Sequence, residues 1–214
     1  MRYGALALVV NALALICGGI TIADAAESTR IVVLGDSLTA GYGLAEADSF
    51  PAGLQAALTK NGHDVTVVNA GVSGDTTAGG RARVGWALAP GPEGPADILI
   101  IELGANDGLR GLDPAASEAN LNVIITTAKS KGIRVMLTGM LAPPNLGREY
   151  AAEFAAVFPR LAKKHGVALY PFFLDGVAAV PELNQKDGIH PNAEGVKVIV
   201  ERILPHVERL LAQP

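Results

Sequence analysis

An apolar run gives way to small polar residues in Ile31-Val32-Val33-Leu34-Gly35-Asp36-Ser37-Leu38-Thr39. Ile31–Leu34 is unbroken and rich in β-branched residues, which is typical of a strand buried on both faces of a parallel sheet. Gly35 lets the backbone turn sharply, so that the Ser37 hydroxyl stands at the start of a helical turn above the sheet. The stretch therefore predicts a strand followed by a tight turn into a helix, which is the unit of α/β folds.

The rest of the chain repeats this alternation. Further strands are expected at Val65–Val68, Ile98–Leu103, Val135–Thr138 and Val167–Tyr170. Helical spacing marks Phe50–Lys60, Gly80–Leu88, Ala115–Lys131, Tyr150–His165 and Ala193–Leu211. Pro159 falls inside the fourth of these helices and is expected to kink or split it. The alternation predicts a doubly wound α/β fold in which a five-stranded parallel sheet is sandwiched between two helical layers.

Length and composition narrow the protein class. A chain of 214 residues suits one domain, which we expect to span residues 26–214. Half of the residues are hydrophobic and 18% are charged, so a disordered chain is not expected. The formal net charge is −4, and there is no run of like charges. Nucleic-acid binding favours the opposite charge balance, so no nucleic-acid partner is expected.

The first 25 residues have the pattern of a secretory signal peptide. Arg2 precedes a long apolar stretch, Ala5–Ile22, and Ala23-Asp24-Ala25 follows it as a cleavage site. We expect an exported protein, periplasmic or secreted, with no stable membrane insertion once the leader is removed. An uncleaved anchor is the alternative, because the apolar stretch approaches the length of a membrane span. The single cysteine, Cys17, lies in this leader, so the mature chain would have no disulfide, thiol nucleophile or zinc–thiolate site.

Polar groups follow the first three predicted strands. In α/β sheets, ligands bind outside the carboxyl ends of the strands. Ser37 follows the first strand, a loop with Gly71 and Gly74 follows the second, and Asn106 follows the third. The serine could be a nucleophile, and backbone N–H groups and an asparagine amide could stabilise negative charge. Taken singly, the same residues suit a helix cap, an ordinary loop and an Asx-turn.

The fourth polar segment, Asp187–Asn192, precedes the last predicted helix. Asp187 and His190 are three residues apart across a glycine, which lets the carboxylate reach Nδ1 of the imidazole and leaves Nε2 free as a base. A metal site at this pair would need further ligands, and none is nearby in the sequence. A nucleophile, an oriented base and two donors at strand ends together favour acyl-transfer chemistry.

These residues also carry a family resemblance. The chain resembles the SGNH (GDSL) hydrolase superfamily, and within it the secreted thioesterase I / lysophospholipase L1 / arylesterase group. The matching blocks, in order, are Gly35-Asp36-Ser37-Leu38, Gly74, Gly104-x-Asn106-Asp107 and Asp187-x-x-His190. Ala105 is a small departure, because relatives often have glycine there. The resemblance covers about Arg30 to Leu211 and implies a three-layer, flavodoxin-like SGNH hydrolase fold.

The resemblance also implies a role for each residue. Ser37 would be the nucleophile, His190 the base and Asp187 the group that orients it. The oxyanion hole would consist of the Ser37 N–H, the Gly74 N–H and the Asn106 side chain. No cofactor and no metal are expected. The expected reaction is hydrolysis of carboxylic esters and thioesters through an acyl-enzyme, with an acidic limb of the pH–rate profile around pH 6–7 from the imidazole base.

Substrate preference rests on the loops after the strands. Thr77–Gly80, Leu109–Leu112 and Leu141–Gly147 are expected to wall the cleft, and their apolar residues favour an acyl chain over a sugar. The expected partner is a small acyl ester or thioester (an aryl ester, an acyl thioester or a lysophospholipid), bound by a monomer. One alternative is a carbohydrate O-acetyl esterase on the same fold. Another is a non-catalytic flavodoxin-like module that binds a phosphate or a flavin.

Overall fold

The computed structural model describes residues 28–213 and contains one parallel sheet. Its strand order is β2-β1-β3-β4-β5. The strands are β1 Thr29–Gly35, β2 Val65–Gly71, β3 Ile98–Glu102, β4 Arg134–Thr138 and β5 Ala168–Tyr170. At the carboxyl edge, Gly35 is in register with Gly71 on one side and Glu102 on the other. The predicted five-stranded parallel sheet is confirmed.

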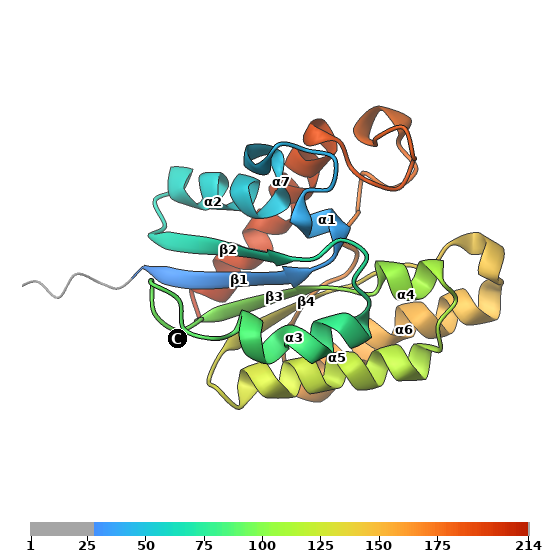
Figure 1. Ribbon diagram of the computed structural model, residues 1–214, viewed down its shortest axis with the longest axis horizontal. Helices are drawn as coiled ribbons and strands as arrows, with labels where there is room; N and C mark the ends of the chain where they lie inside the picture. Colours follow the sequence, from blue (N-terminus) through green and yellow to red (C-terminus); the bar gives the residue numbers. More distant parts are fainter. Residues whose placement is uncertain (1–27, 214) are drawn as a thin grey trace, which may run out of the picture.

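Helices cover both faces of the sheet, as Figure 1 shows. The α-helices are α1 Ser37–Ala40, α2 Phe50–Lys60, α3 Thr77–Ala87, α4 Ala105–Leu109, α5 Pro114–Lys129, α6 Arg148–His165 and α7 Ala193–Leu211. Helices α2 and α7 pack together on one face, and α3, α5 and α6 pack on the other. Short 3-10 helices occupy Glu46–Asp48, Pro144–Leu146 and Pro181–Leu183. The result is the predicted three-layer sandwich. Within residues 28–213, no helix is both long and apolar enough to cross a membrane.

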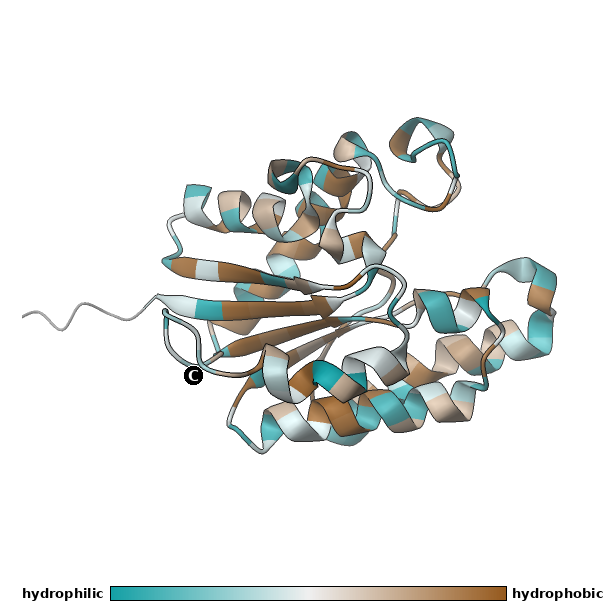
Figure 2. Cartoon of the chain, viewed as in Figure 1, coloured by the Kyte–Doolittle hydropathy of each residue, from teal (hydrophilic) through white to brown (hydrophobic). Residues whose placement is uncertain are grey.

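The core is centred on the inner strands, which are brown in Figure 2. Ile31–Leu34 and Ile98–Ile101 have no exposed surface, because β1 and β3 are covered by helices on both faces. The edge strand β2 is different: several of its residues are partly exposed. The prediction of burial on both faces therefore holds for the inner strands and is wrong for the edge strands β2 and β5, each of which has only one neighbouring strand.

Two helices differ from the sequence-based expectation. Helix α3 begins at Thr77, three residues earlier than predicted, where the Thr76 hydroxyl accepts a hydrogen bond from the Gly79 N–H at 3.4 Å. Pro159 does not split α6, which continues from Arg148 to His165. The neighbouring Phe158 is almost fully buried in the core, and this tertiary packing compensates for the hydrogen bond that proline cannot make.

The strand order places a crevice at the carboxyl edge of the sheet. From β1 the chain crosses to β2 on one side, and it then returns to β3 on the other side of β1. Loops that follow neighbouring strands diverge at such a switch point, which leaves room for a ligand. The short helices α1 and α4 begin on the two sides of this point, directly after β1 and β3 (Figure 1).

Candidate active site

Ser37 is the first residue of α1, directly above the end of β1. Its presentation depends on Gly35, because a Cβ there would lie 2.2 Å from Thr39 Oγ1 and 2.8 Å from the Glu102 carbonyl oxygen. Asp36 caps the helix: its Oδ1 accepts a hydrogen bond from the Leu38 N–H at 3.0 Å. The first N–H groups of a helix have no acceptor within the helix, so the Ser37 N–H is available to a ligand. It belongs to the same residue as the hydroxyl and therefore lies close to it.

His190 and Asp187 lie against Ser37 in the folded chain. Nε2 of His190 is 2.9 Å from the Ser37 hydroxyl, although 153 residues separate the two. Nδ1 of His190 is 2.7 Å from an oxygen of Asp187. An ionised carboxylate only accepts hydrogen bonds, so Nδ1 carries the proton and the neutral imidazole offers Nε2 as an acceptor to the serine hydroxyl. This is the geometry that a serine nucleophile with a histidine base requires.

Asp187 remains ionised over the whole neutral range. The hydrogen bond from His190, together with the backbone N–H groups of His190 and Ile189, lowers the pKa of Asp187 to about 2. These two N–H groups lie 3.1 and 3.0 Å from the carboxylate. The Asp187 side chain is 39% exposed, so the solvent screens its electrostatic contribution and the orientation of the imidazole is its main effect.

Two residues to which the sequence analysis gave no role, Gln185 and Tyr42, hold the histidine loop in place. The Gln185 side-chain amide donates to the Tyr42 carbonyl at 2.8 Å and to the Pro191 carbonyl at 3.0 Å. The Gln185 N–H donates to the His190 carbonyl at 2.8 Å. The Tyr42 ring lies over the imidazole, with a centroid distance of 4.5 Å. No local pattern reveals the two contacts with Tyr42, because they join segments more than 140 residues apart.

The other two predicted donors lie after β2 and β3, and the loop that contains Gly74 contacts Asn106 through Asp75. Gly74 has a φ of +85° in a turn that the Asp75 N–H closes onto the Val72 carbonyl at 3.1 Å. Among the described residues, no group accepts from the Gly74 N–H. The Asn106 amide donates to the Asp75 carbonyl at 2.8 Å and to Asp36 Oδ2 at 3.2 Å. The structure therefore brings Asn106 against the helix cap of Ser37, with both amide hydrogens already paired.

A pair of buried carboxyl groups lies beneath Ser37. Asp36 and Glu102 have no exposed surface, and the Asp36 N–H donates to Glu102 Oε2 at 3.3 Å. Burial raises the pKa of Asp36 to about 6. Burial, and then the negative charge of Asp36, raise the pKa of Glu102 well above its usual range. Glu102 therefore keeps its proton to a higher pH than an exposed glutamate would. The sequence analysis assigned no role to Glu102, because a single acidic residue at a strand end carries no pattern.

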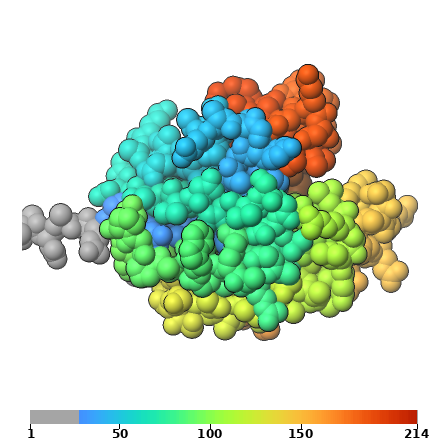
Figure 3. All heavy atoms as spheres, in the orientation of Figure 1, coloured from blue at the N-terminus to red at the C-terminus, as the bar shows by residue number. Residues whose placement is uncertain are grey.

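An apolar pocket of about 360 Å³ opens beside Ser37 and His190. Its apolar lining includes Leu38, Leu109, Met140, Leu141, Phe172 and Ile189. Of the predicted walls, Leu109 and Leu141–Pro143 contribute to the pocket, whereas Thr77–Gly80 does not. Thr77 is buried instead, and its hydroxyl donates to Asp107 at 2.6 Å. The segment around Phe172, which the sequence analysis missed, also lines the pocket. Figure 3 shows the red-orange and yellow segments of the chain standing apart at this end of the molecule.

The described residues contain no group of three or more histidine, cysteine, aspartate and glutamate side chains that could hold a metal ion. The remaining histidines lie away from the crevice. His63 contacts Glu208, and His165 contacts Asn122. His206 lies edge-on to Tyr170. His190 is therefore the histidine that belongs to this site.

Comparison with known proteins assigns the family. Residues 33–198 match the GDSL-like Lipase/Acylhydrolase family. The chain belongs to this family. It is 42% identical to Esterase TesA of Pseudomonas aeruginosa over 186 residues, which cover 87% of this chain and 91% of that protein. It is also 42% identical to an arylesterase of Vibrio mimicus over 174 residues, covering 81% and 86% of the two chains.

A third relative has a compound name. The chain is 36% identical over 187 residues to "Thioesterase 1/protease 1/lysophospholipase L1" of Escherichia coli strain K12, covering 87% of each chain. The crystal structure of TesA superposes with a TM-score of 0.80 at 41% identity, covering 85% of this chain and 99% of that one. The predicted SGNH (GDSL) hydrolase fold and the predicted enzyme class, an ester hydrolase, are thereby confirmed for this GDSL hydrolase.

Proposed function

We propose that this GDSL hydrolase cleaves carboxylic esters and thioesters with Ser37 as nucleophile, His190 as general base and Asp187 as the residue that orients the imidazole. The observation that carries the proposal is the continuous chain of contacts from Asp187 through His190 to Ser37, at 2.7 and 2.9 Å, at the mouth of an apolar pocket. The lowered pKa of Asp187, about 2, keeps its carboxylate ionised, as the orienting role requires.

The reaction has two steps. The Ser37 oxygen attacks the acyl carbon while its proton passes to Nε2 of His190. The bond from the acyl carbon to the leaving oxygen or sulfur then breaks, and the imidazolium returns the proton to the leaving alcohol or thiol. In the second step, His190 takes a proton from water, the resulting hydroxide attacks the acyl-enzyme, and the proton goes back to Ser37 as the acid leaves.

The negative charge that develops on the acyl oxygen needs donors already in place. We assign these to the Ser37 N–H, the Gly74 N–H and the Asn106 side chain. The Ser37 and Gly74 N–H groups are available to a ligand. Asn106 would exchange its longer contact, 3.2 Å to Asp36, for the substrate oxygen, while the 2.8 Å contact to the Asp75 carbonyl holds the amide in place.

The pocket supports an aliphatic acyl chain as the preferred group. Its walls are mostly aliphatic or aromatic side chains, and the polar residues that line it lie chiefly near Ser37 and His190. We therefore propose aryl esters, acyl thioesters and lysophospholipids as substrates, consistent with the names of the relatives above. No cofactor and no metal take part in the proposed steps.

The first test is release of p-nitrophenol from a series of acyl esters, from acetyl to palmitoyl. We expect turnover that peaks beyond acetyl and that falls on the order of 10³-fold or more in Ser37→Ala. Ser130→Ala, at the end of α5, is the matched control and should keep full activity. Activity confined to acetyl esters would favour the carbohydrate O-acetyl esterase. Full activity in Ser37→Ala would overturn the mechanism, and no turnover with a bound chromophore would favour the non-catalytic module.

We also propose that the mature enzyme is an exported monomer that begins after Ala25. Residues 1–25, which carry the predicted signal peptide, lie outside the described residues. Expression of the full chain in a bacterial host should yield a protein outside the cytoplasm whose N-terminal sequence starts at Ala26. A retained leader in the membrane fraction would contradict this proposal. Sedimentation of the mature enzyme tests the oligomeric state.

A further inference from the structure

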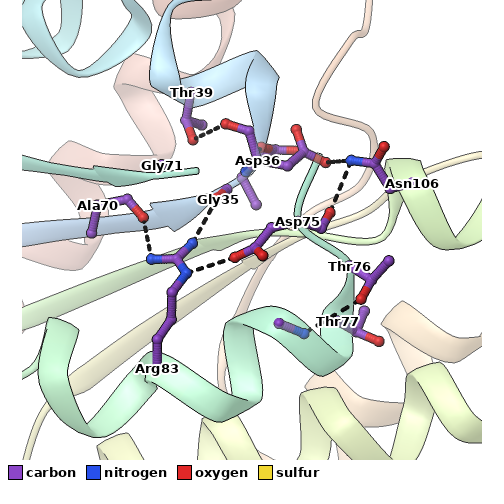
Figure 4. Close-up of polar contacts among 12 residues, drawn as sticks. Gly35, Asp36, Thr39, Ala70, Gly71, Asp75, Thr76, Thr77, Arg83 and Asn106 are labelled. Carbon is purple, nitrogen blue, oxygen red and sulfur yellow. Dashed lines mark hydrogen bonds and ion pairs between the residues drawn. The ribbon is translucent and has the colours of Figure 1, made fainter. Parts of the chain in front are cut away.

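Arg83, on helix α3, ties together the loops that carry the site, as Figure 4 shows. Its Nη2 donates to the Gly35 carbonyl at 2.9 Å, and its Nη1 donates to the Ala70 carbonyl at 2.6 Å. Its Nε donates to Asp75 Oδ2 at 2.6 Å. One guanidinium thus contacts the ends of β1 and β2 and the loop that follows β2. The sequence analysis did not single out this residue, because its partners are 8 to 48 residues away.

Asp75 connects this guanidinium to both oxyanion donors outside helix α1. Its carboxylate accepts a hydrogen bond from Nε of Arg83, and its backbone carbonyl accepts one from the Asn106 amide at 2.8 Å. Its own N–H closes the turn that contains Gly74. Helix α3 is shaped around this carboxylate, because a Cβ at Gly79 would lie 2.2 Å from Asp75 Oδ1. A shift of Asp75 would therefore move the Gly74 N–H and the Asn106 amide together.

The Arg83–Asp75 ion pair has the properties of a rigid support. The two side chains are only 17% and 18% exposed, so the pair is screened less by solvent than a surface ion pair. Guanidinium is planar and always charged, and it can bind several acceptors in a fixed geometry. A lysine at this position would offer a single flexible ammonium in place of the three directed contacts.

We propose that Arg83, acting through Asp75, is a positioning residue for the oxyanion hole and fixes the Gly74 N–H and the Asn106 amide where the substrate oxygen becomes negative. The inference rests on the roles proposed above for these two donors. Arg83 itself touches neither substrate nor nucleophile. Its removal should therefore weaken stabilisation of the transition state while leaving the acyl pocket and ground-state binding nearly unchanged.

The test compares the wild-type enzyme with Arg83→Met, Arg83→Lys and Asp75→Asn on p-nitrophenyl butyrate. We expect kcat to fall about 10²-fold in Arg83→Met, since displacement of catalytic groups by about 1 Å has an effect of this size. Arg83→Lys should restore part of the loss, and KM should stay within about threefold, because the pocket is intact. Arg81→Met is the matched control: Arg81 lies on the same helix, is exposed, and contacts only Asn120 at 3.3 Å.

A transition-state analogue separates positioning from general loss of structure. An alkyl trifluoromethyl ketone adds to the serine hydroxyl and places a tetrahedral oxyanion in the hole. Its inhibition constant should rise in Arg83→Met by about the factor lost from kcat, whereas inhibition by the butyrate product should be unchanged. Asp75→Asn retains the side-chain shape and should show the same pattern with a smaller loss, so the test does not depend on the folding of one variant.

Several results would overturn the inference. One is an unchanged kcat per folded molecule in Arg83→Met, and another is an equal loss of affinity for the butyrate product and the trifluoromethyl ketone. The double variant with Asn106→Ala gives a further criterion: the two losses should be far less than multiplicative, because both act on one donor set. Fully multiplicative losses would contradict the proposal. An Asn106→Ala variant with the full wild-type kcat would instead refute the proposed oxyanion hole itself.

Discussion

The buried carboxyl pair beneath Ser37 predicts how stability depends on pH. Glu102 has no exposed surface, and its Oε1 has no hydrogen-bond partner among residues 28–213. Burial and the charge of Asp36 raise its pKa well above the usual range. The native protein therefore keeps a proton on Glu102 at a pH where the unfolded chain has released it. Because the native state binds more protons, the free energy of unfolding falls as pH rises above about 4.5.

The perturbation is Glu102→Gln, which replaces a protonated carboxyl group with a neutral amide of nearly the same shape. The amide oxygen can still accept from the Asp36 N–H, so the hydrogen bond that Glu102 accepts is kept. One extra proton in the native state changes the free energy of unfolding by about 1.4 kcal/mol per pH unit. Above about pH 4.5 the variant should therefore gain stability relative to the wild type, by at most about 1.4 kcal/mol for each pH unit over which native Glu102 keeps its proton.

The assay is urea unfolding at pH 5, 6 and 7, followed by far-UV circular dichroism. The difference between the two proteins is the quantity to plot, because the contributions of all other titrating groups cancel. Glu201→Gln, on the exposed side of α7, is the control and should give a constant difference. A constant difference for Glu102→Gln as well would refute the reasoning, since it would mean that Glu102 is already ionised in the native protein at pH 5.

Three further predictions concern the site. Asp187→Asn should lower kcat on the order of 10³–10⁴-fold, because the amide no longer fixes the His190 tautomer. In the wild type, protonation of Asp187 should not lower the activity above about pH 4, because its pKa of about 2 keeps the carboxylate ionised and paired with His190. Steady-state assays from pH 4 to 8 check both points. Gly43→Ala should lower both Tm and kcat, because φ is +72° and the new Cβ would lie 2.3 Å from Gln185 Oε1; a calorimetric Tm equal to that of the wild type would contradict this. Ala178→Phe should shorten the preferred acyl chain by filling part of the pocket, with acetyl ester hydrolysis retained, and an unchanged p-nitrophenyl ester profile would remove Ala178 from the acyl site.

Much of the site was predictable because parallel α/β sheets impose a simple rule. Residues that follow neighbouring strands meet at one edge, so Ser37, Gly74 and Asn106 could be grouped before their distances were known. The pairing of Asp187 with His190 was also predictable, because three residues across a glycine form a local turn. The pocket was predicted less well. Phe172 follows β5, and nothing in its local sequence shows that it lines the same pocket as Leu109 and Leu141.

The sequence by itself determined the alternation of strands and helices and the order in which the polar blocks follow the strands. Both are local properties, set by hydrophobic periodicity and by glycine at sharp turns. Only the tertiary structure decided that Nε2 of His190 lies 2.9 Å from Ser37, that Glu102 lies buried beside Asp36, and that Arg83 joins the ends of β1 and β2 to the loop after β2. These contacts depend on strand order and on packing between helices and sheet. Hydrophobic periodicity predicts neither strand order nor this packing, because it describes each segment alone and not its neighbours in space.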